Sequence, residues 1–346
     1  MKKNRIAVAG AGLIGVRHAA LLKACPETEL AAIVDPREAT RIIAAEAGVN
    51  WFGSLDELFA SDPPDGIIVA TPNVNHLENG LTCVQAGCPM LIEKPLAVTS
   101  IEARTLVDAA QAGGIPILVG HHRRHNPLIR AAKSTIDEGA LGRIRGVQAI
   151  CWFYKPDPYY AEAPWRTRKG AGPIAVNLVH DIDLLRFLCG EVVRVQAQAA
   201  PSLRGFENED VAAAVLGFEN GAVGTITVSD MITAPWSWEM TARENPAYPP
   251  TDQSCYLIGG TRASLSLPDL TLWHNGESPD WMRPMNATTL LREQSEPLFN
   301  QIAHFAAVID GREKPLVSGR EGLETIRVIE AIQQAAESGE AITLSH

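Results

Sequence analysis

The chain has 346 residues, 46% of them apolar, and a formal net charge of −10. This length favours two domains over one, and the apolar fraction is sufficient for packed cores. The acidic balance argues against a nucleic-acid partner, which would need a basic face, and no stretch approaches the roughly 18 uninterrupted apolar residues of a membrane span.

The cysteines indicate a reducing environment. Six of them are scattered along the chain without a CxxC pair: Cys25, Cys83, Cys88, Cys151, Cys189 and Cys255. Most stand in apolar surroundings, so we expect buried thiols and a cytoplasmic location. The MKKNR start before an apolar run resembles a signal peptide, but the Gly-Ala-Gly break that follows argues against one.

The first third of the chain alternates short apolar runs with helix-compatible stretches. Strands are predicted at Ile6–Ala9, Leu30–Val34, Ile67–Ala70, Met90–Ile92 and Ile117–Val119. Helices are predicted between and after them at Val16–Ala24, Glu38–Ala47, Leu55–Ala60, His76–Ala86 and Ser100–Ala112. This order predicts an α/β fold with a doubly wound parallel sheet that is buried on both faces.

A glycine-rich turn joins the first predicted strand to the first helix. The sequence GAGLIG places Gly10, Gly12 and Gly15 at its first, third and sixth positions. Such glycines allow a tight turn, a close approach of backbone to a pyrophosphate, and close packing of the helix on the strand. Asp35 ends the next apolar strand about 20 residues further on, where it would accept hydrogen bonds from an adenosine ribose. In this context a dinucleotide-binding turn is favoured over an ordinary glycine turn.

The same segment indicates which dinucleotide is bound. Leu13 and Ile14 lie between the glycines at the start of the helix, where backbone N–H groups point at phosphates. NAD is favoured over NADP because Asp35 would repel a 2′-phosphate. Arg37, two residues further on, offers a phosphate partner and leaves NADP possible.

A polar loop, Thr71-Pro-Asn-Val-Asn-His76, follows the third predicted strand. In an open α/β sheet the carboxyl ends of the strands face the ligand crevice. Thr71, Asn75 and His76 are therefore candidate cofactor contacts. A simple turn into the next helix, with Asn75 as the N-cap, explains the loop equally well.

Glu93-Lys94-Pro95 follows the fourth predicted strand, again at a carboxyl end. Beside a nicotinamide, Glu93 and Lys94 would bind a substrate hydroxyl and assist proton transfer, provided that burial or another cation lowers the pKa of the lysine. The bond before Pro95 is a candidate cis peptide bond. On spacing alone, a surface ion pair is the favoured interpretation.

The pattern changes after Gly120. A basic segment over 121–133 opens a new unit, and β-rich segments follow it: GRIRGVQAICWF, VVRVQAQAA, DVAAAVLGF, GAVGTITVSD and CYLIGG. One helix from Pro173 to the residue before Gly190 interrupts them, and helical segments Pro297–Ile309 and Arg320–Ser338 end the chain. We therefore expect a dinucleotide-binding domain over residues 1–121 and a second α+β domain over residues 122–346.

The helix predicted over 173–189 carries Asn177, His180 and Asp183, each three residues from the next and so near neighbours on its surface. A histidine in the N-terminal half of a helix that faces a cleft is a candidate general acid or base at neutral pH. Asn177 and Asp183 are candidate substrate contacts. A structural histidine held by hydrogen bonds is the alternative interpretation.

Trp165 and Arg166 precede this helix in a loop rich in aromatic residues. The pair is a candidate to close over a nicotinamide, which would make Arg166 a cofactor contact, or over a sugar ring, which would make Trp165 a substrate contact. Aromatic side chains serve as core residues at least as often.

The histidines of HHRRHNP invite a metal interpretation. No carboxylate or cysteine stands beside His121, His122 and His125 at a recognisable spacing, so we expect no metal site there. Contact with cofactor or substrate is the more natural role for a segment that follows the fifth strand. Arg123 is a candidate to hold a hydroxyl-rich or acidic substrate.

Taken together, the glycine turn, TPNxxH, EKP, HHRRHNP and GAGPIAVNLVHDIDLLRFLCG resemble the glucose–fructose oxidoreductase / inositol dehydrogenase / MocA (Gfo/Idh/MocA) family over nearly the whole length. The resemblance implies a Rossmann domain followed by an α/β domain with a large open, mainly antiparallel sheet. In the family that sheet commonly forms a dimer or tetramer interface. The resemblance also implies NAD(P)-dependent oxidation or reduction of sugars, inositols or related polyols.

Two residues match the family's catalytic positions. Lys94 matches the active-site lysine and His180 the catalytic histidine. One position departs from the family: many members have an aspartate four residues before the histidine, where this chain has Val176. The neighbouring Asn177 cannot take up a proton at neutral pH, so proton transfer is expected to rest on Lys94 and His180.

Other matches concern the cofactor. Asp35 matches the ribose-binding acid, and Trp165-Arg166 resembles a cofactor-contacting pair of some members. The leading hypothesis is a dehydrogenase that moves a hydride between nicotinamide and a hydroxyl-bearing carbon. Two alternatives stay open: retained NAD that is reduced and re-oxidised in one cycle to give elimination, hydrolysis or epimerisation, and a non-catalytic dinucleotide sensor.

Overall fold

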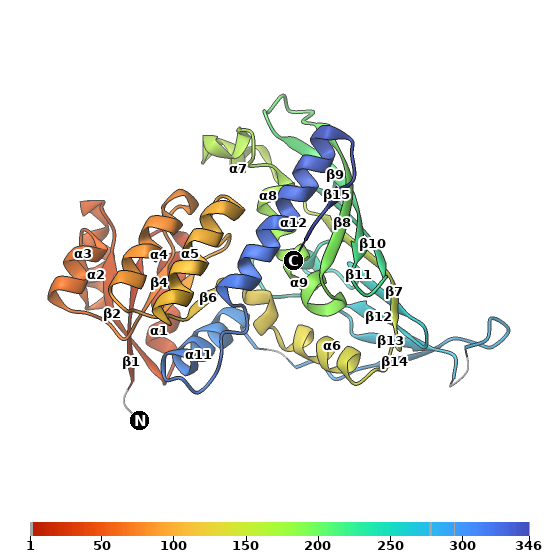
Figure 1. Ribbon diagram of the computed structural model, residues 1–346, viewed down its shortest axis with the longest axis horizontal. Helices are drawn as coiled ribbons and strands as arrows, with labels where there is room; N and C mark the ends of the chain where they lie inside the picture. Colours follow the sequence, from red (N-terminus) through yellow and green to blue (C-terminus); the bar gives the residue numbers. More distant parts are fainter. Residues whose placement is uncertain (1–2, 277–278, 294, 346) are drawn as a thin grey trace. The chain divides into compact units, whose positions relative to one another are not determined.

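The structure is a computed structural model and describes residues 3–276, 279–293 and 295–345. They form two compact units (Figure 1): the first comprises residues 1–126 and 295–326, and the second residues 127–294 and 327–346. This division differs from the expected boundary after residue 121, because the segment from residue 295 returns to the first unit. The helix α12 (Gly319–Ser338) begins in the first unit and ends in the second.

The first unit is built on a six-stranded sheet in which every neighbouring pair is parallel. Its strands are β1 (Asn4–Ala9), β2 (Thr28–Val34), β3 (Asn50–Phe52), β4 (Gly66–Val69), β5 (Met90–Ile92) and β6 (Ile117–Val119). Their order, β3-β2-β1-β4-β5-β6, is that of a doubly wound dinucleotide-binding fold. From β1, the chain adds β2 and β3 on one side and then β4, β5 and β6 on the other. The ligand crevice is therefore expected at the carboxyl ends of β1 and β4, where the strand order reverses.

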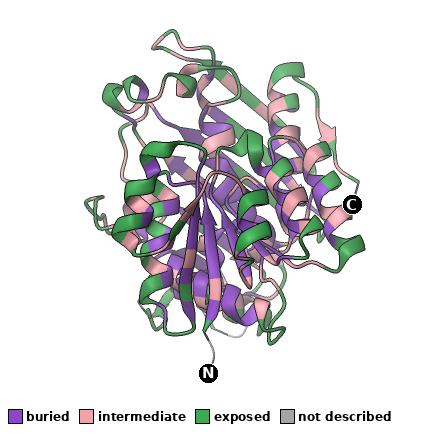
Figure 2. Ribbon diagram, turned by 90° about the vertical axis from the view of Figure 1, so that its left-hand side faces the viewer, coloured by how far each residue is buried: buried purple, intermediate pink, exposed green. Residues whose placement is uncertain are grey.

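Helices cover both faces of this sheet, and its central strands are almost fully buried (Figure 2). The helices are α1 (Leu13–Ala24), α2 (Arg41–Ala47), α3 (Leu55–Ser61), α4 (His76–Gln85), α5 (Ser100–Gly113) and α11 (Pro297–Ile309), with short 3₁₀ turns η1 (Glu38–Thr40), η2 (Asn73–Asn75) and η3 (His122–His125). The continuous apolar runs of the strands follow from this burial on two sides. The five predicted strands and five predicted helices of this region are confirmed, whereas the three-residue strand β3 was not predicted.

The second unit contains a nine-stranded sheet in the order β14-β13-β12-β11-β7-β10-β9-β8-β15. Its strands are β7 (Ile144–Trp152), β8 (Val192–Pro201), β9 (Glu209–Phe218), β10 (Val223–Ser229), β11 (Tyr256–Gly260), β12 (Ser264–Leu267), β13 (Thr271–His274), β14 (Asn286–Thr289) and β15 (Ile342–Thr343). β10 and β7 run parallel, and the other neighbouring pairs are antiparallel. The large, mainly antiparallel sheet that the resemblance implied is therefore confirmed.

One face of this sheet forms the core of the second unit. Apolar side chains of α6 (Pro127–Asp137), α9 (Leu178–Cys189) and the second half of α12 pack against it. Four short helical segments complete the unit: α7 (Asp157–Ala161), η4 (Pro164–Thr167), α8 (Pro173–Val176) and α10 (Trp238–Thr241).

The opposite face of the sheet is exposed. The strand register aligns Gln196, Val215, Thr225, Gln148 and Leu257 in one row across five strands. All five residues are exposed, while their neighbours along each strand are buried or partly buried. This alternation is typical of an antiparallel sheet with one packed face.

The helix predicted over 173–189 is interrupted. It forms two helices, α8 and α9, with Asn177 between them at φ −98° and ψ −54°. The spacing of the apolar residues predicts one continuous helix, because this spacing is the same on both sides of Asn177 and does not indicate a break. The interruption places Asn177 at the start of α9, ahead of His180.

Candidate active site

The glycine turn of the first unit has the geometry that a dinucleotide requires. Gly10 has φ +96°, and a Cβ there would lie 2.4 Å from the Ala70 carbonyl oxygen. A Cβ on Gly15 would lie 1.8 Å from the Gly10 carbonyl oxygen, so helix and turn meet too closely for a side chain. A Cβ on Gly12 would meet nothing within 4 Å. Gly10 and Gly15 are therefore needed by the turn itself, whereas Gly12 leaves space above the backbone for a ligand.

The first turn of α1 faces that space. Its N-cap residue is Gly12, which has no side chain with which to cap the helix, and Leu13 is 95% exposed. An exposed leucine beside uncapped N–H groups is the surface that a bound pyrophosphate and its sugars would cover. These residues fit the dinucleotide that the sequence predicts.

Asp35 lies at the carboxyl end of β2 and is 3% exposed. Its carboxylate accepts hydrogen bonds from the Ala11 N–H (2.8 Å) and from Nε (2.9 Å) and Nη2 (2.8 Å) of Arg37. Burial raises its pKa, but the Arg37 side chain and the two backbone N–H groups of Ala11 and Arg37 outweigh burial and hold the pKa at about 2. Asp35 is thus a charged acceptor across the working pH range.

His76 holds two loops together. Its ring nitrogens lie 2.8 Å from the Pro95 carbonyl oxygen and 2.9 Å from that of Thr71, and the residue is fully buried. Burial lowers the pKa of His76, against the opposing effect of these carbonyl groups and of Glu93. The ring therefore fastens the loop after β4 to the loop after β5. The predicted cap is absent, because Asn75 makes no side-chain capping hydrogen bond to α4.

Glu93 pairs with a histidine of α1 and is not a surface residue. Its Oε1 lies 2.7 Å from Nε2 of His18, which is fully buried, and its Oε2 accepts a hydrogen bond from the Lys94 N–H at 3.2 Å. Burial raises the pKa of Glu93, but the His18 hydrogen bond and the charges of His18, Lys94 and His122 have the larger, opposite effect. The resulting pKa is about 2. The carboxylate thus anchors the backbone of Lys94, which is half-buried after β5, and the Lys94–Pro95 bond is cis as the sequence suggested.

The histidine segment after β6 is mostly buried. His121, Arg123 and His125 are 1%, 3% and 4% exposed. Arg124 forms a 2.8 Å ion pair with Glu321 of α12. Among residues 3–276, 279–293 and 295–345, no group of three or more His, Cys, Asp or Glu side chains is arranged to hold a metal ion.

In the second unit, the residues predicted from the helix over 173–189 are all buried. Asn177, His180 and Asp183 are 7%, 9% and 1% exposed. Asn177 Oδ1 accepts a hydrogen bond from Lys155 Nζ at 2.7 Å, and Lys155 is itself 7% exposed. Lys155 was not among the residues predicted from the sequence. Its signal is a lysine within the aromatic segment CWFYKP at the carboxyl end of a strand.

Trp165 and Arg166 lie in η4 of the second unit. Trp165 is 57% exposed, whereas Arg166 stacks on Tyr159 with its guanidinium 3.8 Å from the ring centre and donates to the Tyr159 carbonyl oxygen. The tryptophan is therefore accessible to a ligand, and the arginine is held by its own loop.

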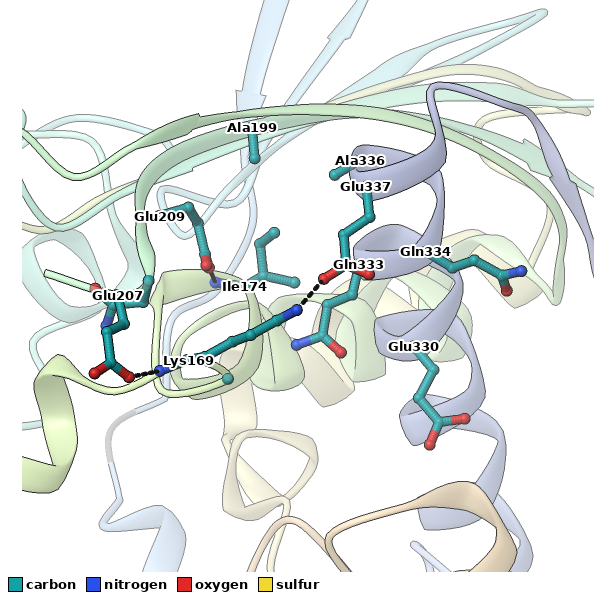
Figure 3. A pocket seen from close by; sticks show the side chains of 12 residues that line it. Lys169, Ile174, Ala199, Glu207, Glu209, Glu330, Gln333, Gln334, Ala336 and Glu337 are labelled. Carbon is teal, nitrogen blue, oxygen red and sulfur yellow. Dashed lines mark hydrogen bonds and ion pairs between the residues drawn. The ribbon is translucent and has the colours of Figure 1, made fainter.

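A cavity of about 540 Å³ opens elsewhere in the second unit (Figure 3). Its lining consists of Lys169, Gly170, Ile174, Ala199, Glu207, Asn208, Glu209, Glu330, Gln333, Gln334, Ala336 and Glu337. Lys169 reaches across it to Glu337 at 2.9 Å, and Glu209 accepts a hydrogen bond from the Ile174 N–H at 3.0 Å. Burial raises the pKa of Glu209. None of the residues predicted to contact cofactor or substrate lines this cavity.

The structure thus brings Gly12, Asp35, Thr71 and Lys94 to the carboxyl ends of β1, β2, β4 and β5 within the first unit. His180 and Asn177 belong to the second unit. All six cysteines are buried, as expected. None of the helices in the described part of the chain combines the length and hydropathy needed to cross a bilayer.

Two family models match the chain. An oxidoreductase family with an NAD-binding Rossmann fold matches residues 4–121, and the GFO/IDH/MocA C-terminal domain matches residues 129–266. The chain is 28% identical over 311 residues to 1,5-anhydro-D-fructose reductase of Ensifer adhaerens, covering 86% of each chain. It is 30% identical to levoglucosan dehydrogenase of Pseudarthrobacter phenanthrenivorans over 65% of this chain and 67% of that one.

A solved structure agrees with these matches. The WlbA dehydrogenase from Bordetella pertussis, in complex with NADH and UDP-GlcNAcA, superposes with a TM-score of 0.80 at 26% identity over the whole of both chains. Sequence and fold therefore lead to one conclusion: the chain belongs to the Gfo/Idh/MocA family of oxidoreductases, with an NAD-binding Rossmann domain at its N-terminus.

Proposed function

We propose that this oxidoreductase transfers a hydride between nicotinamide and a hydroxyl-bearing carbon of a sugar, inositol or related polyol. The observation that carries the proposal is the position of Lys94, anchored after β5 at the same sheet edge as the Gly12 turn and Asp35. An ammonium group at this edge suits a substrate hydroxyl beside the cofactor. The names of the relatives, a reductase of an anhydro sugar and a dehydrogenase of levoglucosan, support a carbohydrate substrate.

The cofactor would be held by residues of the first unit. Gly12, Leu13 and Ile14 would receive the pyrophosphate, and Asp35 the adenosine ribose, which favours NAD over NADP. Nicotinamide, when bound, supplies the acceptor or donor of the hydride. Thr71 and Asn75 would contact the cofactor from the loop after β4, whereas His76 and Glu93 act on the site through the loops that they fasten.

Two side chains would handle the proton. In the oxidation direction, His180 takes the hydroxyl proton as the C–H bond gives up its hydride, and Lys94 donates a hydrogen bond to the same oxygen and stabilises its developing charge. The proton then passes from His180 to water. Val176 stands where many members of the family have an aspartate, so this pair works without that carboxylate.

Other contacts to the substrate are proposed from residue type and, for Trp165 alone, also from exposure. Trp165 is exposed enough to stack on a sugar ring, and Arg166 beside it is proposed as a cofactor contact. Asn177, Asp183 and Arg123 are proposed as polar contacts.

The chain is further proposed to act as a dimer or tetramer in the cytoplasm. The exposed sheet face of the second unit carries Val215 (42% exposed) and Leu257 (48% exposed) in one aligned row, which suits burial against a second copy. The six buried cysteines suit a reducing compartment. Sedimentation velocity checks the assembly, and a monomer at micromolar concentration would contradict it.

The test is a screen of sugars, inositols and sugar acids with NAD, in which the absorbance of NADH reports the reaction. We expect at least one substrate to be oxidised. Lys94→Ala and His180→Ala should each lower kcat by at least about 100-fold, with the Kd for NADH within about threefold of wild type. Near-full activity in both variants would contradict the assigned roles, and no hydride transfer across the panel would contradict the proposed reaction.

A further inference from the structure

Asn177 occupies an unusual place in the second unit. It sits at the break between α8 and α9, and its backbone carbonyl accepts a hydrogen bond from the His180 N–H at 3.1 Å. Asn177 and His180 therefore belong to the same helical turn. A group that holds the Asn177 carboxamide therefore acts within one helical turn of His180.

Lys155 is such a group. Its Nζ donates to Asn177 Oδ1 at 2.7 Å, and both residues are 7% exposed. The Lys155 backbone is held on both sides, because its N–H donates to the Asp230 carbonyl oxygen at 2.9 Å and its carbonyl oxygen accepts from Arg204 Nη2 at 2.8 Å. Nζ also lies 5.1 Å from the centre of the Tyr159 ring. The lysine is thus a rigidly placed donor.

The chemistry of the pair sets the orientation of the amide. A lysine ammonium has donors and no acceptor, so Asn177 must turn its oxygen toward it. The Nδ2 group then points away from Lys155 and presents two N–H donors. Without the lysine, the carboxamide would be free to rotate and to offer its oxygen instead.

On the basis of the proposed function, we infer that Lys155 is a positioning residue, which holds Asn177 so that its N–H groups bind an acceptor oxygen of the substrate next to His180. The substrate class is a polyol or sugar acid with a second oxygen close to the reacting carbon. Lys155 touches neither the reacting atoms nor the cofactor in this role; it acts through Asn177.

The kinetic test is a double-variant cycle with Lys155→Met, Asn177→Ala and the two combined. The probes are inositol, glucose and glucuronate at saturating NAD. On the probe that wild type oxidises, each single variant should raise KM about tenfold or more with kcat within about threefold, and the double variant should be no worse than Asn177→Ala. Lys155→Arg, whose guanidinium also only donates, should restore most of the loss. Lys133→Met, which removes a lysine paired with Asp137 on α6, is the matched control and should behave as wild type.

A second measurement needs no substrate. In protein labelled with ¹⁵N-asparagine, the side-chain amide signals of Asn177 are identified by their absence in Asn177→Ala. Lys155→Met should shift these signals, whereas Lys155→Arg and Lys133→Met should leave them near their wild-type positions. Unchanged signals in Lys155→Met, or additive kinetic losses in the cycle, would overturn the inference. Shifted signals without turnover of any probe would support the positioning role and contradict the proposed function.

Discussion

At the scale of single residues, Asp35 and Arg37 decide which dinucleotide fits. Arg37 grips the Asp35 carboxylate with two nitrogens while its own side chain is 63% exposed. The carboxylate lies at the position expected for the ribose, with an exposed guanidinium beside it. The carboxylate excludes a 2′-phosphate, and the arginine would favour one as soon as the carboxylate is removed.

We therefore predict that Asp35→Ser weakens NADH binding about tenfold and brings the Kd for NADPH to or below that for NADH. Because the pKa of Asp35 is about 2 and the second pKa of a phosphate monoester is about 6, the wild-type preference for NADH should be constant between roughly pH 7 and 9. Fluorescence titration of the two reduced dinucleotides measures this. Adding Arg37→Ala to Asp35→Ser should remove the gain for NADPH, and a wild-type preference for NADPH would refute the role given to Asp35.

The sequence predicted which residues stand at the ends of strands, but it did not predict which side chains they contact. Lys94 could be placed after a strand because EKP follows an apolar run. The pairing of Glu93 with His18 could not, since the two residues are 75 positions apart and only the packing of α1 on the sheet joins them. The role of Lys155 could not be predicted for the same reason. It depends on a hydrogen bond to Asn177, which only the packing of the segment after β7 against the α8–α9 break brings about.

At the scale of elements, the turn between β1 and α1 shows that its three glycines serve different purposes. Gly15 is required by the contact of the helix with the Gly10 carbonyl oxygen, while Gly12 has open space around it and a φ of −82° that any residue adopts. Stability and ligand binding are thus separable within six residues.

Gly12→Ala should keep the melting temperature within about 2 °C of wild type and weaken NADH binding about tenfold or more, since the methyl group enters the space for the pyrophosphate. Gly15→Ala should instead destabilise the chain by about 2 kcal/mol or more, because helix and turn must separate. Differential scanning fluorimetry and NADH titration on both variants test this. Equal melting temperatures for the two, or full affinity in Gly12→Ala, would show that the turn is used differently.

Strands that are continuous apolar runs could be predicted from the sequence even where they are short, whereas short strands of mixed composition could not. The strands of the first sheet are continuous apolar runs between turn signals, so their positions were readable. The strands β3, β12, β13 and β14 are equally short but mix polar with apolar residues, so they carry no continuous apolar run. The break at Asn177 escaped prediction because the apolar spacing continues on both sides of it.

At the scale of the whole molecule, the chain order does not coincide with the spatial units. The expected boundary after residue 121 follows the change in pattern, but the segment 295–326 belongs with the first unit because α11 packs on its sheet. A helix that returns to an earlier domain leaves no local mark in its own sequence. The fold class, in contrast, follows from the alternation of strands and helices and from the glycine turn.

The proposed reaction requires that Lys94 and His180 both reach one substrate oxygen. A crystal structure with NAD and the substrate identified in the screen measures this directly. We predict that Lys94 Nζ and a ring nitrogen of His180 both lie within about 3.2 Å of the hydroxyl oxygen of the reacting carbon. If either group is turned to another atom or lies beyond hydrogen-bonding reach of that oxygen, the proposed division of proton transfer between them is contradicted.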